Sequence, residues 1–420
     1  MTLPDKIRLL DVGIAGAEAG LLQHASQYTF SYRRDDPGQR PVALLMPPST
    51  LEYRDTALFP VLDQNLPEGF LLARLREAFP KQQITPMHLL ALVGANGIGH
   101  LGFRLPDALP AVAPKAISRE QLLQSRADGD LFDELVRAYL STGVGISGIQ
   151  PKILVPDRST WHVPNLIVKA GAASYPGLAA NEYVCLQAAQ AAGIEVPRHE
   201  LSQSGELLVL DRFDLGEYGQ RLGFEDIASL MGLQVRDLFS DRKYQGSYES
   251  IAEVLRLLQL DGDLPRFFEQ VAFSIMVRNG DAHLKNFGVL YTFPPDARLA
   301  PMFDVVTTAI YEYSRFAGGP PMEDFTMALK LFKGRHPTKT YPETEELVRF
   351  AREVCKVPDP AGVLERIADG MTTVLKKAAS DDRIDSGLLA KMKEKWDLGL
   401  VYAREARKRS SGSRAPRARR

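Results

Sequence analysis

The chain has 420 residues, of which 45% are hydrophobic and 25% are charged, and its formal net charge is -1. This length predicts roughly two or three units that each bury a core. A net charge near zero argues against a protein that binds nucleic acid with its whole surface, so any basic partner site must be local.

The two cysteines, Cys185 and Cys355, have no second Cys or His at ligand spacing. We therefore expect buried, reduced thiols and neither a disulfide framework nor a zinc site. The N-terminus has no apolar stretch of signal length, and no run approaches the roughly 20 apolar residues that span a bilayer. These features predict a cytoplasmic protein that makes no membrane contact.

Residues 1–105 are expected to form a β-rich N-terminal subdomain. Short apolar segments broken by turn residues predict strands, at residues 7–13, 28–32 and 42–46. Helical patterns follow at residues 70–78 and 86–92. The Pro- and Ala-rich stretch at residues 106–114 predicts a linker.

Residues 115–220 mix helices and strands around a glycine-rich loop. A helical pattern over residues 118–142 precedes that loop. The elements predicted after it are a strand over 166–169, a helix over 181–192 and a strand over 206–213.

Residues 221–403 have mostly helical patterns, with a helix over 264–279 and a strand over 287–291. The basic segment 404–420 has no aromatic residue and no aliphatic residue larger than Ala, so we expect a disordered tail. Its alternative use is salt-sensitive attachment to DNA phosphates.

The spacing of Asp281 and Asn286 indicates phosphoryl transfer. Asp281 is followed five positions later by Asn286, between a predicted helix and a predicted strand. Kinase catalytic loops have this spacing, with the Asp accepting a hydroxyl proton and the Asn holding a metal ion. In kinases a second metal-binding carboxylate lies downstream of the loop, and Asp304 stands at a suitable position.

Two further residues of this loop carry hypotheses. Lys285 is positioned to neutralise the transferring phosphoryl group. His283 is expected to be a structural hydrogen-bonding residue, because Asp281 already takes the part of the base.

Glycines at positions 143, 145 and 148 match the dinucleotide-binding spacing literally. That interpretation needs a strand before the loop and a helix after it. Here the flanks are reversed, because a helical pattern precedes the loop and Pro151 leads into an extended segment at residues 153–155. A flap whose backbone N–H groups cover nucleotide phosphates fits better, with an ordinary glycine-rich hairpin as the alternative.

Three positions between the loop and residue 213 complete a kinase plan. Lys169 ends a predicted strand at a suitable distance for the lysine that pairs with nucleotide phosphates, or it is a solvated strand end. Glu182 opens the next helix, where it would orient Lys169 or favour the helix dipole. The strand ending at Asp211 leads into the helical part, where a kinase hinge would contact adenine; a plain core strand is the alternative.

These residues together resemble the HipA-like serine/threonine kinases of type II toxin-antitoxin systems. The resemblance rests on motifs in chain order, at residues 65–69, 94–103, 145–152, 168–169, 181–182, 211–214, 279–286 and 303–304. It implies an α+β, two-lobed protein-kinase-like fold. Its parts are a β-rich N-terminal subdomain (1–105), a kinase-like N-lobe with the phosphate loop (115–220) and an all-helical C-terminal lobe (221–403), followed by the basic tail (404–420).

The resemblance also implies roles for individual residues, with ATP and Mg²⁺ as cofactors. Asp281 would be the base, and Asn286 and Asp304 the metal ligands. The nucleotide-binding residues implied are Ser147, Gly148, Ile149, Gln150, Pro151, Lys152, Lys169, Asp211, Arg212, Phe213, His283 and Phe303.

The phosphate loop departs from the family pattern at one position. Relatives often begin this motif with a Ser whose autophosphorylation ejects the loop and inactivates the kinase, whereas this chain has Gly145 there. Glycine cannot be phosphorylated. Ser147 is therefore the candidate for autophosphorylation.

The resulting hypothesis is a toxin kinase that phosphorylates a serine or threonine of a translation component, with an aminoacyl-tRNA synthetase as the implied target. A helix-turn-helix antitoxin that binds operator DNA is the implied partner, so DNA contact is indirect or through the basic tail. Two alternatives stay open: a small-molecule kinase, and an inactive kinase-like module in a DNA-bound repressor complex.

Overall fold

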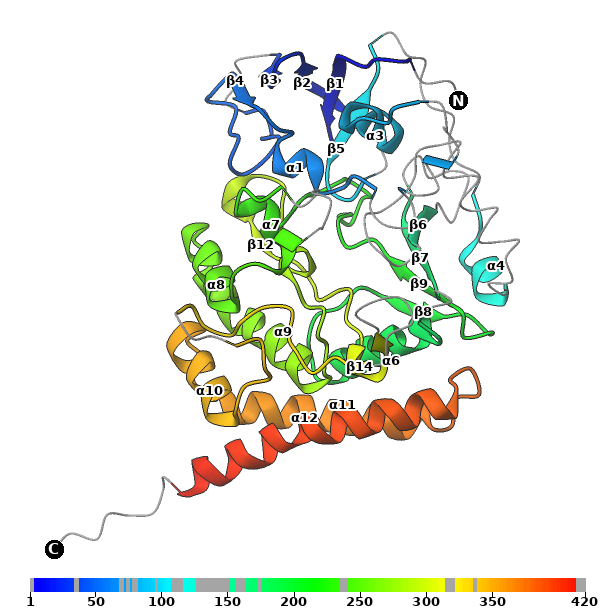
Figure 1. Cartoon of the computed structure of the whole chain (residues 1–420), viewed down its shortest axis with the longest axis vertical. Helices are drawn as coiled ribbons and strands as arrows, with labels where there is room; N and C mark the ends of the chain where they lie inside the picture. The colour runs from blue at the N-terminus through cyan, green and yellow to red at the C-terminus, as the bar shows by residue number, and fades with distance from the viewer. Residues whose placement is uncertain are drawn as a thin grey trace, which may run out of the picture. The chain divides into compact units, whose positions relative to one another are not determined.

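The structure is a computed structural model of the whole chain, coloured along the sequence in Figure 1. It describes residues 4–33, 38–67, 72, 76–77, 82–94, 97–106, 116–125, 152–155, 164–171, 175–234, 241–313, 322–334 and 338–412. The chain divides into two compact units. The first consists of residues 1–179, 198–243 and 287–300, and the second of residues 180–197, 244–286 and 301–420.

An antiparallel sheet forms the N-terminal part of the first unit, in the strand order β4-β3-β2-β1-β5. Its strands are β1 (Leu9–Ile14), β2 (Ala17–His24), β3 (Tyr28–Tyr32), β4 (Glu52–Asp55) and β5 (Leu101–Arg104). In β3, buried and half-buried residues alternate, because successive side chains of a strand point to opposite faces. The buried face packs with α1 (Pro60–Asp63) and α3 (Pro86–Val93) in one apolar core.

A second antiparallel sheet of the first unit has the order β6-β7-β9-β8. Its strands are β6 (Lys152–Val155), β7 (Leu166–Ala170), β8 (His199–Leu201) and β9 (Leu207–Asp211). All five residues of β7 are buried, as expected for a central strand. The helix α4 (Arg119–Gln124) packs against β9.

Two smaller antiparallel sheets complete the strands of the described residues. One contains β10 (Gly223–Asp226), β11 (Gly288–Tyr291) and β12 (Arg298–Leu299), and α7 (Ile227–Leu230) continues directly from β10. The other pairs β13 (Glu312–Tyr313) with β14 (Met322–Glu323).

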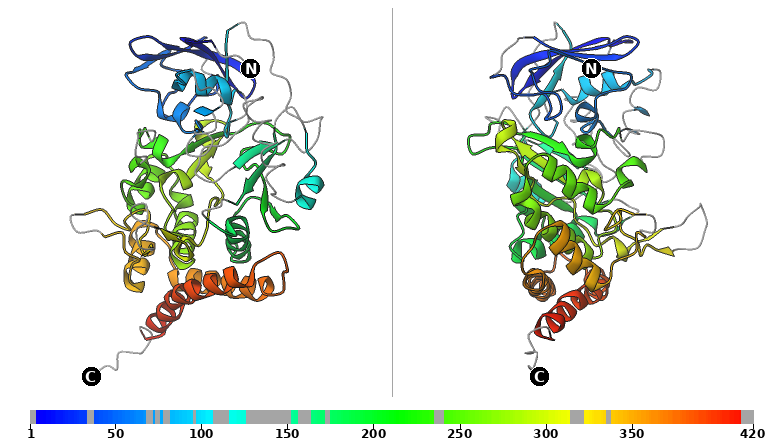
Figure 2. Two further views of the ribbon diagram at one scale, coloured as in Figure 1. Left: turned by 45° about the vertical axis from the view of Figure 1, so that its right-hand side comes forward. Right: turned by 90° about the vertical axis from the view of Figure 1, so that its left-hand side faces the viewer.

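The second unit is built mainly from helices. These are most of α6 (Leu178–Ala191), then α8 (Tyr248–Leu257), α9 (Leu264–Met276), α10 (Thr344–Arg349), a π-helical turn (Phe350–Val354), α11 (Pro360–Ala378) and α12 (Ser386–Gly412). The last two helices lie side by side in all three views of Figures 1 and 2. Single 3₁₀ turns occur at Asp241–Tyr244, Asp261–Asp263, Leu284–Asn286, Pro294–Asp296 and Thr308–Ile310.

Helix α12 approaches α9 closely at Gly399. A Cβ atom added to Gly399 would lie only 1.9 Å from the backbone oxygen of Met276, which no real contact tolerates. Trp396, one turn earlier on α12, is fully buried. The absence of a side chain at position 399 therefore allows α12 to cover the C-terminal end of α9.

Most elements predicted over described residues are present, and three expectations were wrong. Residues 221–403 are not all helical, because they contain the strands β10 to β14. Residues 42–46 form no strand, because the Tyr32 hydroxyl accepts the backbone N–H of Val42 and donates to the backbone oxygen of Met46. Ala43 and Met46 make only an isolated bridge with each other, and Leu45 is exposed. Residues 404–412 are helical rather than disordered, because α12 continues to Gly412 and buries the small side chain of Ala406. Residues 413–420 lie outside the described residues.

Two other findings concern expectations about composition. Cys185 and Cys355 are free and buried, as predicted. Among the residues that the structure describes, no helix is long and apolar enough to cross a membrane.

We predict that Gly399→Ala destabilises the protein by about 3 kcal/mol or more, because the added methyl group must displace backbone rather than a flexible side chain. Urea unfolding of the purified variant measures this. Gly262→Ala is the matched control, since nothing lies within 4 Å of a Cβ atom at that position. Equal unfolding midpoints for the two variants would contradict the close approach.

Candidate active site

The loop that follows α9 is held by hydrogen bonds to its backbone. The side-chain oxygen of Asn279 accepts the N–H of Asp281 at 3.1 Å, and Thr308 Oγ1 accepts the N–H of Gly280 at 2.6 Å. Tyr248, on α8, donates its hydroxyl to the backbone oxygen of Ala282 at 3.0 Å. Three side chains of the second unit therefore fix the path of the chain around Asp281.

Asp281 and Asn286 are joined through the residue between them. The N–H of His283 donates to the backbone oxygen of Asp281 at 2.8 Å and to Asn286 Oδ1 at 3.2 Å. The N–H of Asn286 in turn donates to the backbone oxygen of His283 at 2.9 Å. The five-residue spacing read from the sequence thus closes into a compact turn that ends in the 3₁₀ turn Leu284–Asn286. Lys285 is half-buried in that turn.

Asn286 also connects the loop to Asp304. Its Nδ2 donates to the backbone oxygen of Asp304 at 3.4 Å. Asp304 has a backbone φ of 52°, in the left-handed region that Asp adopts more readily than most residues. The half-buried residues Asp281, Asn286 and Asp304 are therefore connected within the second unit, and Phe303, also half-buried, precedes Asp304. Their roles in catalysis and binding stay predictions.

Helix α6 is hydrogen-bonded to the segment that carries Asp304. Asn181 and Thr307 exchange two hydrogen bonds, from Asn181 Nδ2 to the Thr307 oxygen at 3.1 Å and from the Thr307 N–H to Asn181 Oδ1 at 2.9 Å. Trp396 Nε1 donates to Thr307 Oγ1 at 2.8 Å. Asn181, Thr307 and Trp396 are fully buried. Glu182, the next residue of α6, is buried as well.

A tyrosine contacts the carboxylate of Asp281. Tyr244, at the end of the 3₁₀ turn Asp241–Tyr244, donates its hydroxyl to Asp281 Oδ1 at 2.7 Å. Its ring packs edge-on against His283, with 5.2 Å between centroids. Tyr244 was not predicted as a site residue, because it is 37 positions from Asp281 in a segment with no periodic pattern.

The predicted nucleotide residues lie in the first unit. Lys169 is a buried residue of β7, and the register of β6 and β7 places position 152 directly opposite position 169. Residues 143–151, which include Gly145, Ser147, Gly148, Ile149, Gln150 and Pro151, lie outside the described residues. The predicted proximity of Lys169 to Asp281 and Glu182 stays a prediction, because Lys169 belongs to the first unit and the two acidic residues to the second.

The segment predicted as the adenine hinge is anchored by its side chains inside the first unit. Asp211 forms an ion pair with Arg119 of α4. Arg212 and Asp214 form a second pair at 2.5 Å, and both side chains are 0% exposed. Phe213 packs edge-on against Phe224. The buried charges of Arg212 and Asp214 are thus not available for contact with adenine, whereas the Asp211 side chain is 38% exposed.

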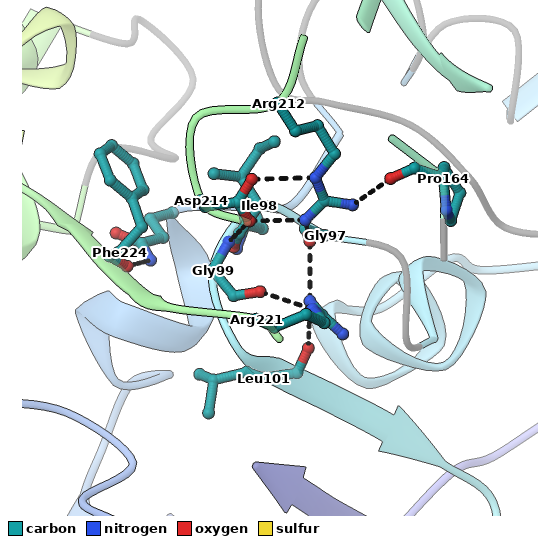
Figure 3. Close-up of polar contacts among 11 residues, drawn as sticks. Gly97, Ile98, Gly99, Leu101, Pro164, Arg212, Asp214, Arg221 and Phe224 are labelled. Atoms are coloured by element: carbon teal, nitrogen blue, oxygen red, sulfur yellow. Dashed lines mark hydrogen bonds and ion pairs between the residues drawn. The ribbon is translucent and has the colours of Figure 1, made fainter. Parts of the chain in front are cut away.

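Figure 3 shows how this segment is connected to residues 97–101 of the N-terminal part. Arg212 donates to the backbone oxygen of Gly97 at 2.9 Å, and Asp214 Oδ2 accepts the N–H of Gly99 at 2.6 Å. Arg221 donates to the backbone oxygens of Gly97, Gly99 and Leu101 at 2.8 to 3.0 Å. Two buried arginines and one buried carboxylate therefore bind the N-terminal sheet to the hinge segment.

Glu225 strengthens the same connection from β10. Its Oε1 accepts the N–H of Leu44 at 2.6 Å and the hydroxyl of Tyr291 at 2.8 Å. Burial raises the pKa of Glu225 to about 7, and the neighbouring carboxyl of Asp226 contributes in the same direction. Near neutral pH this buried carboxyl is thus partly protonated.

The chain matches two protein-family models, the HipA-like C-terminal domain over residues 144–379 and the HipA N-terminal domain over residues 10–104. It belongs to the HipA-like family. The family membership confirms the resemblance read from the motifs. For this HipA-like chain, the connection in Figure 3 joins the end of the N-terminal domain to the C-terminal domain.

Relatives and solved structures agree with this assignment. A protein of Sinorhizobium fredii named "Putative kinase Y4dM" is 31% identical over 163 residues, which cover 34% of this chain and 38% of that protein. A "Putative kinase" of Haemophilus influenzae is 29% identical over 195 residues, covering 42% of this chain and 56% of that one. This chain thus matches about half or less of the length of these relatives.

Among solved structures, HipA of Shewanella oneidensis MR-1, determined in complex with HipB and its operator DNA, has a TM-score of 0.67 and 16% identity. The match covers 94% of this chain and 97% of that one. The α+β, kinase-like fold is therefore confirmed over nearly the whole chain.

We predict that Arg212→Ala destabilises the protein by roughly 3 to 5 kcal/mol, because it leaves the fully buried Asp214 without its partner. Arg54→Ala is the control, since Arg54 pairs with Glu52 at an exposed position and such pairs contribute about 0 to 1 kcal/mol. Urea unfolding of both variants checks the difference. A loss below about 1 kcal/mol for Arg212→Ala would show that the pair is not a structural anchor.

We also predict a pH dependence that originates at Glu225. Because burial raises its pKa from the ordinary 4.5 to about 7, the folded protein retains a proton that the unfolded chain releases. This retained proton stabilises the folded protein by about 3 kcal/mol. The stabilisation is complete below about pH 4.5 and is lost as the pH rises through about 7. Glu225→Gln keeps the acceptor oxygen without a titrating proton. The free energy of unfolding should therefore fall more steeply between pH 5 and about pH 8 in wild type than in the variant; parallel curves would contradict this.

Proposed function

We propose that the chain is an ATP-dependent serine/threonine protein kinase in which Asp281 is the general base. The observation that carries this proposal is the closed turn from Asp281 to Asn286, which is hydrogen-bonded to Asp304. The acceptor hydroxyl oxygen attacks the γ-phosphorus, its proton passes to Asp281, and the bond to the bridging oxygen breaks to release ADP.

The donor groups near Asp304 suit a magnesium ion. Mg²⁺ prefers hard oxygen ligands, and Asn286 and Asp304 offer an amide oxygen and a carboxylate on neighbouring segments. Bound there, the ion would neutralise charge on the nucleotide phosphates. Lys169, position 152 and the loop at residues 147–151 are proposed to hold the phosphates, and Lys285 to stabilise the transferring group. The hinge at Asp211, Arg212 and Phe213 is proposed to receive the adenine.

Family membership supports more specific proposals about biology. HipA of Shewanella oneidensis MR-1 forms a toxin-antitoxin complex with HipB and operator DNA. We propose for this chain a toxin that phosphorylates a translation component such as an aminoacyl-tRNA synthetase, with a DNA-binding antitoxin as partner. Autophosphorylation is proposed at Ser147, because Gly145 has no hydroxyl.

Asp281→Asn is expected to lower phosphoryl transfer by roughly 10²- to 10⁴-fold, the usual contribution of a general base. Phosphoproteomics of cells briefly expressing wild type or variant identifies the acceptors, and initial rates with the purified acceptor then measure the loss. Asp304→Asn should lower the rate as well and weaken use of Mg²⁺-ATP.

Asp261→Asn is the matched control, because Asp261 is an exposed carboxylate of the same unit. Full-rate transfer by Asp281→Asn would reject the assignment of the base. Turnover of small alcohols with no protein phosphosite would indicate a small-molecule kinase instead. The phosphoproteomic mass spectra also test the other proposals. An unmodified Ser147 beside phosphorylated acceptors rules out autophosphorylation at Ser147. Acceptors outside translation rule out a translation component as the target.

A further inference from the structure

Tyr244 makes the contact with Asp281 that a phosphoryl acceptor would have to make. A general base must lie about 2.6–3.2 Å from the hydroxyl whose proton it takes. The hydroxyl of Tyr244 donates to Asp281 Oδ1 at 2.7 Å, within that range. The carboxylate oxygen that accepts from Tyr244 is thereby engaged by a side chain of the protein itself.

The backbone of Asp281 is held by contacts other than this one. Its N–H donates to Asn279 Oδ1, and its backbone oxygen accepts the N–H of His283. The adjoining residues are held as well, Gly280 by Thr308 and Ala282 by Tyr248. The loop is thus fixed through its backbone on both sides of Asp281, so the path of the chain does not require the Tyr244 hydroxyl.

The chain that follows Tyr244 is exposed. Tyr244 is half-buried, and the two residues after it, Gln245 and Gly246, are exposed. Gly246 has a φ of 99°, a conformation that glycine adopts easily and other residues rarely do. Lys339 holds the segment in the observed position, since its Nζ donates to the backbone oxygen of Tyr244 at 3.0 Å and lies 5.6 Å from the ring centroid.

We infer that Tyr244 occupies the acceptor-hydroxyl position of the site and must be displaced before an acceptor can react. This inference rests on the proposed role of Asp281 as the base. In the observed conformation Asp281 Oδ1 already accepts the Tyr244 hydroxyl, so water or any other hydroxyl group must compete with Tyr244 for that oxygen. Binding of the acceptor protein supplies the interactions that replace the Tyr244 contact, so ATP is not hydrolysed before the acceptor arrives.

Hydrolysis of Mg²⁺-ATP by the full-length chain, with water as the acceptor and no protein substrate, tests this inference. In that reaction the water oxygen attacks the γ-phosphorus, its proton passes to Asp281, and ADP leaves. Tyr244→Phe removes only the hydroxyl and keeps the ring against His283 and Lys339. It should raise the rate of ADP formation about tenfold, the lower end of what a hydrogen bond to a charged group contributes.

Tyr53→Phe is the matched control, because the Tyr53 hydroxyl donates to the backbone oxygen of Pro47 at 2.7 Å in the first unit. Its rate should equal that of wild type. In the Asp281→Asn background, Tyr244→Phe should give no increase, because the group that it uncovers is absent.

The outcomes separate the two proposals. An unchanged or lower rate for Tyr244→Phe, with turnover still abolished by Asp281→Asn, overturns the inference and leaves the proposed function standing. Turnover that is insensitive to Asp281→Asn overturns both proposals. Both are also overturned if neither wild type nor any variant turns over ATP, whether or not a protein acceptor is present. Thermal unfolding of each variant shows whether loss of the tyrosine hydroxyl affects the fold. An increase in rate that accompanies a loss of folded protein also counts against the inference.

Discussion

The side chain of Asn286 makes the hydrogen bonds on which the candidate site depends. One amide group accepts from the backbone of its own loop and donates to the backbone beside Asp304. A carboxylate at this position would lack the donor, and a lysine would lack the acceptor. Asn is thus suited both to closing the turn that presents Asp281 and to holding the second acidic residue next to it, while a lone pair of its oxygen stays available for a cation.

Burial of polar groups organises the first unit in a similar way. Arg212, Asp214, Arg221 and Glu225 are all less than 10% exposed, and each has a backbone group of a distant part of the chain among its partners. A buried charge is costly unless it is fully paired, so these residues tolerate only one arrangement of the N-terminal sheet against the hinge segment. The apolar core gives this unit its stability, whereas the polar network specifies how its two parts meet.

The sequence was most informative where the relevant residues lie close together in the chain. Asp281 and Asn286 are five positions apart, and the strands and helices around Lys169 and Glu182 follow local patterns. The Asn181–Thr307 and Tyr244–Asp281 contacts span 126 and 37 positions, and no local pattern encodes them. Residues 42–46 were misassigned for a related reason, because a side chain of a distant strand satisfies the backbone groups that a sheet partner would otherwise take. The helical end of α12 was missed because alanine is small enough to be buried on a helix without an apolar pattern.

The bond from Trp396 to Thr307 has a consequence for the synthesis of the protein. The second unit combines three separate chain segments, and the last of them supplies Trp396 and Gly399. Domains fold as units during translation once their residues have emerged from the ribosome. The segment that carries Asp304 therefore receives its final support only when the chain has been made as far as Trp396. A chain that ends before this residue lacks that support, so we expect such products to have no ordered candidate site.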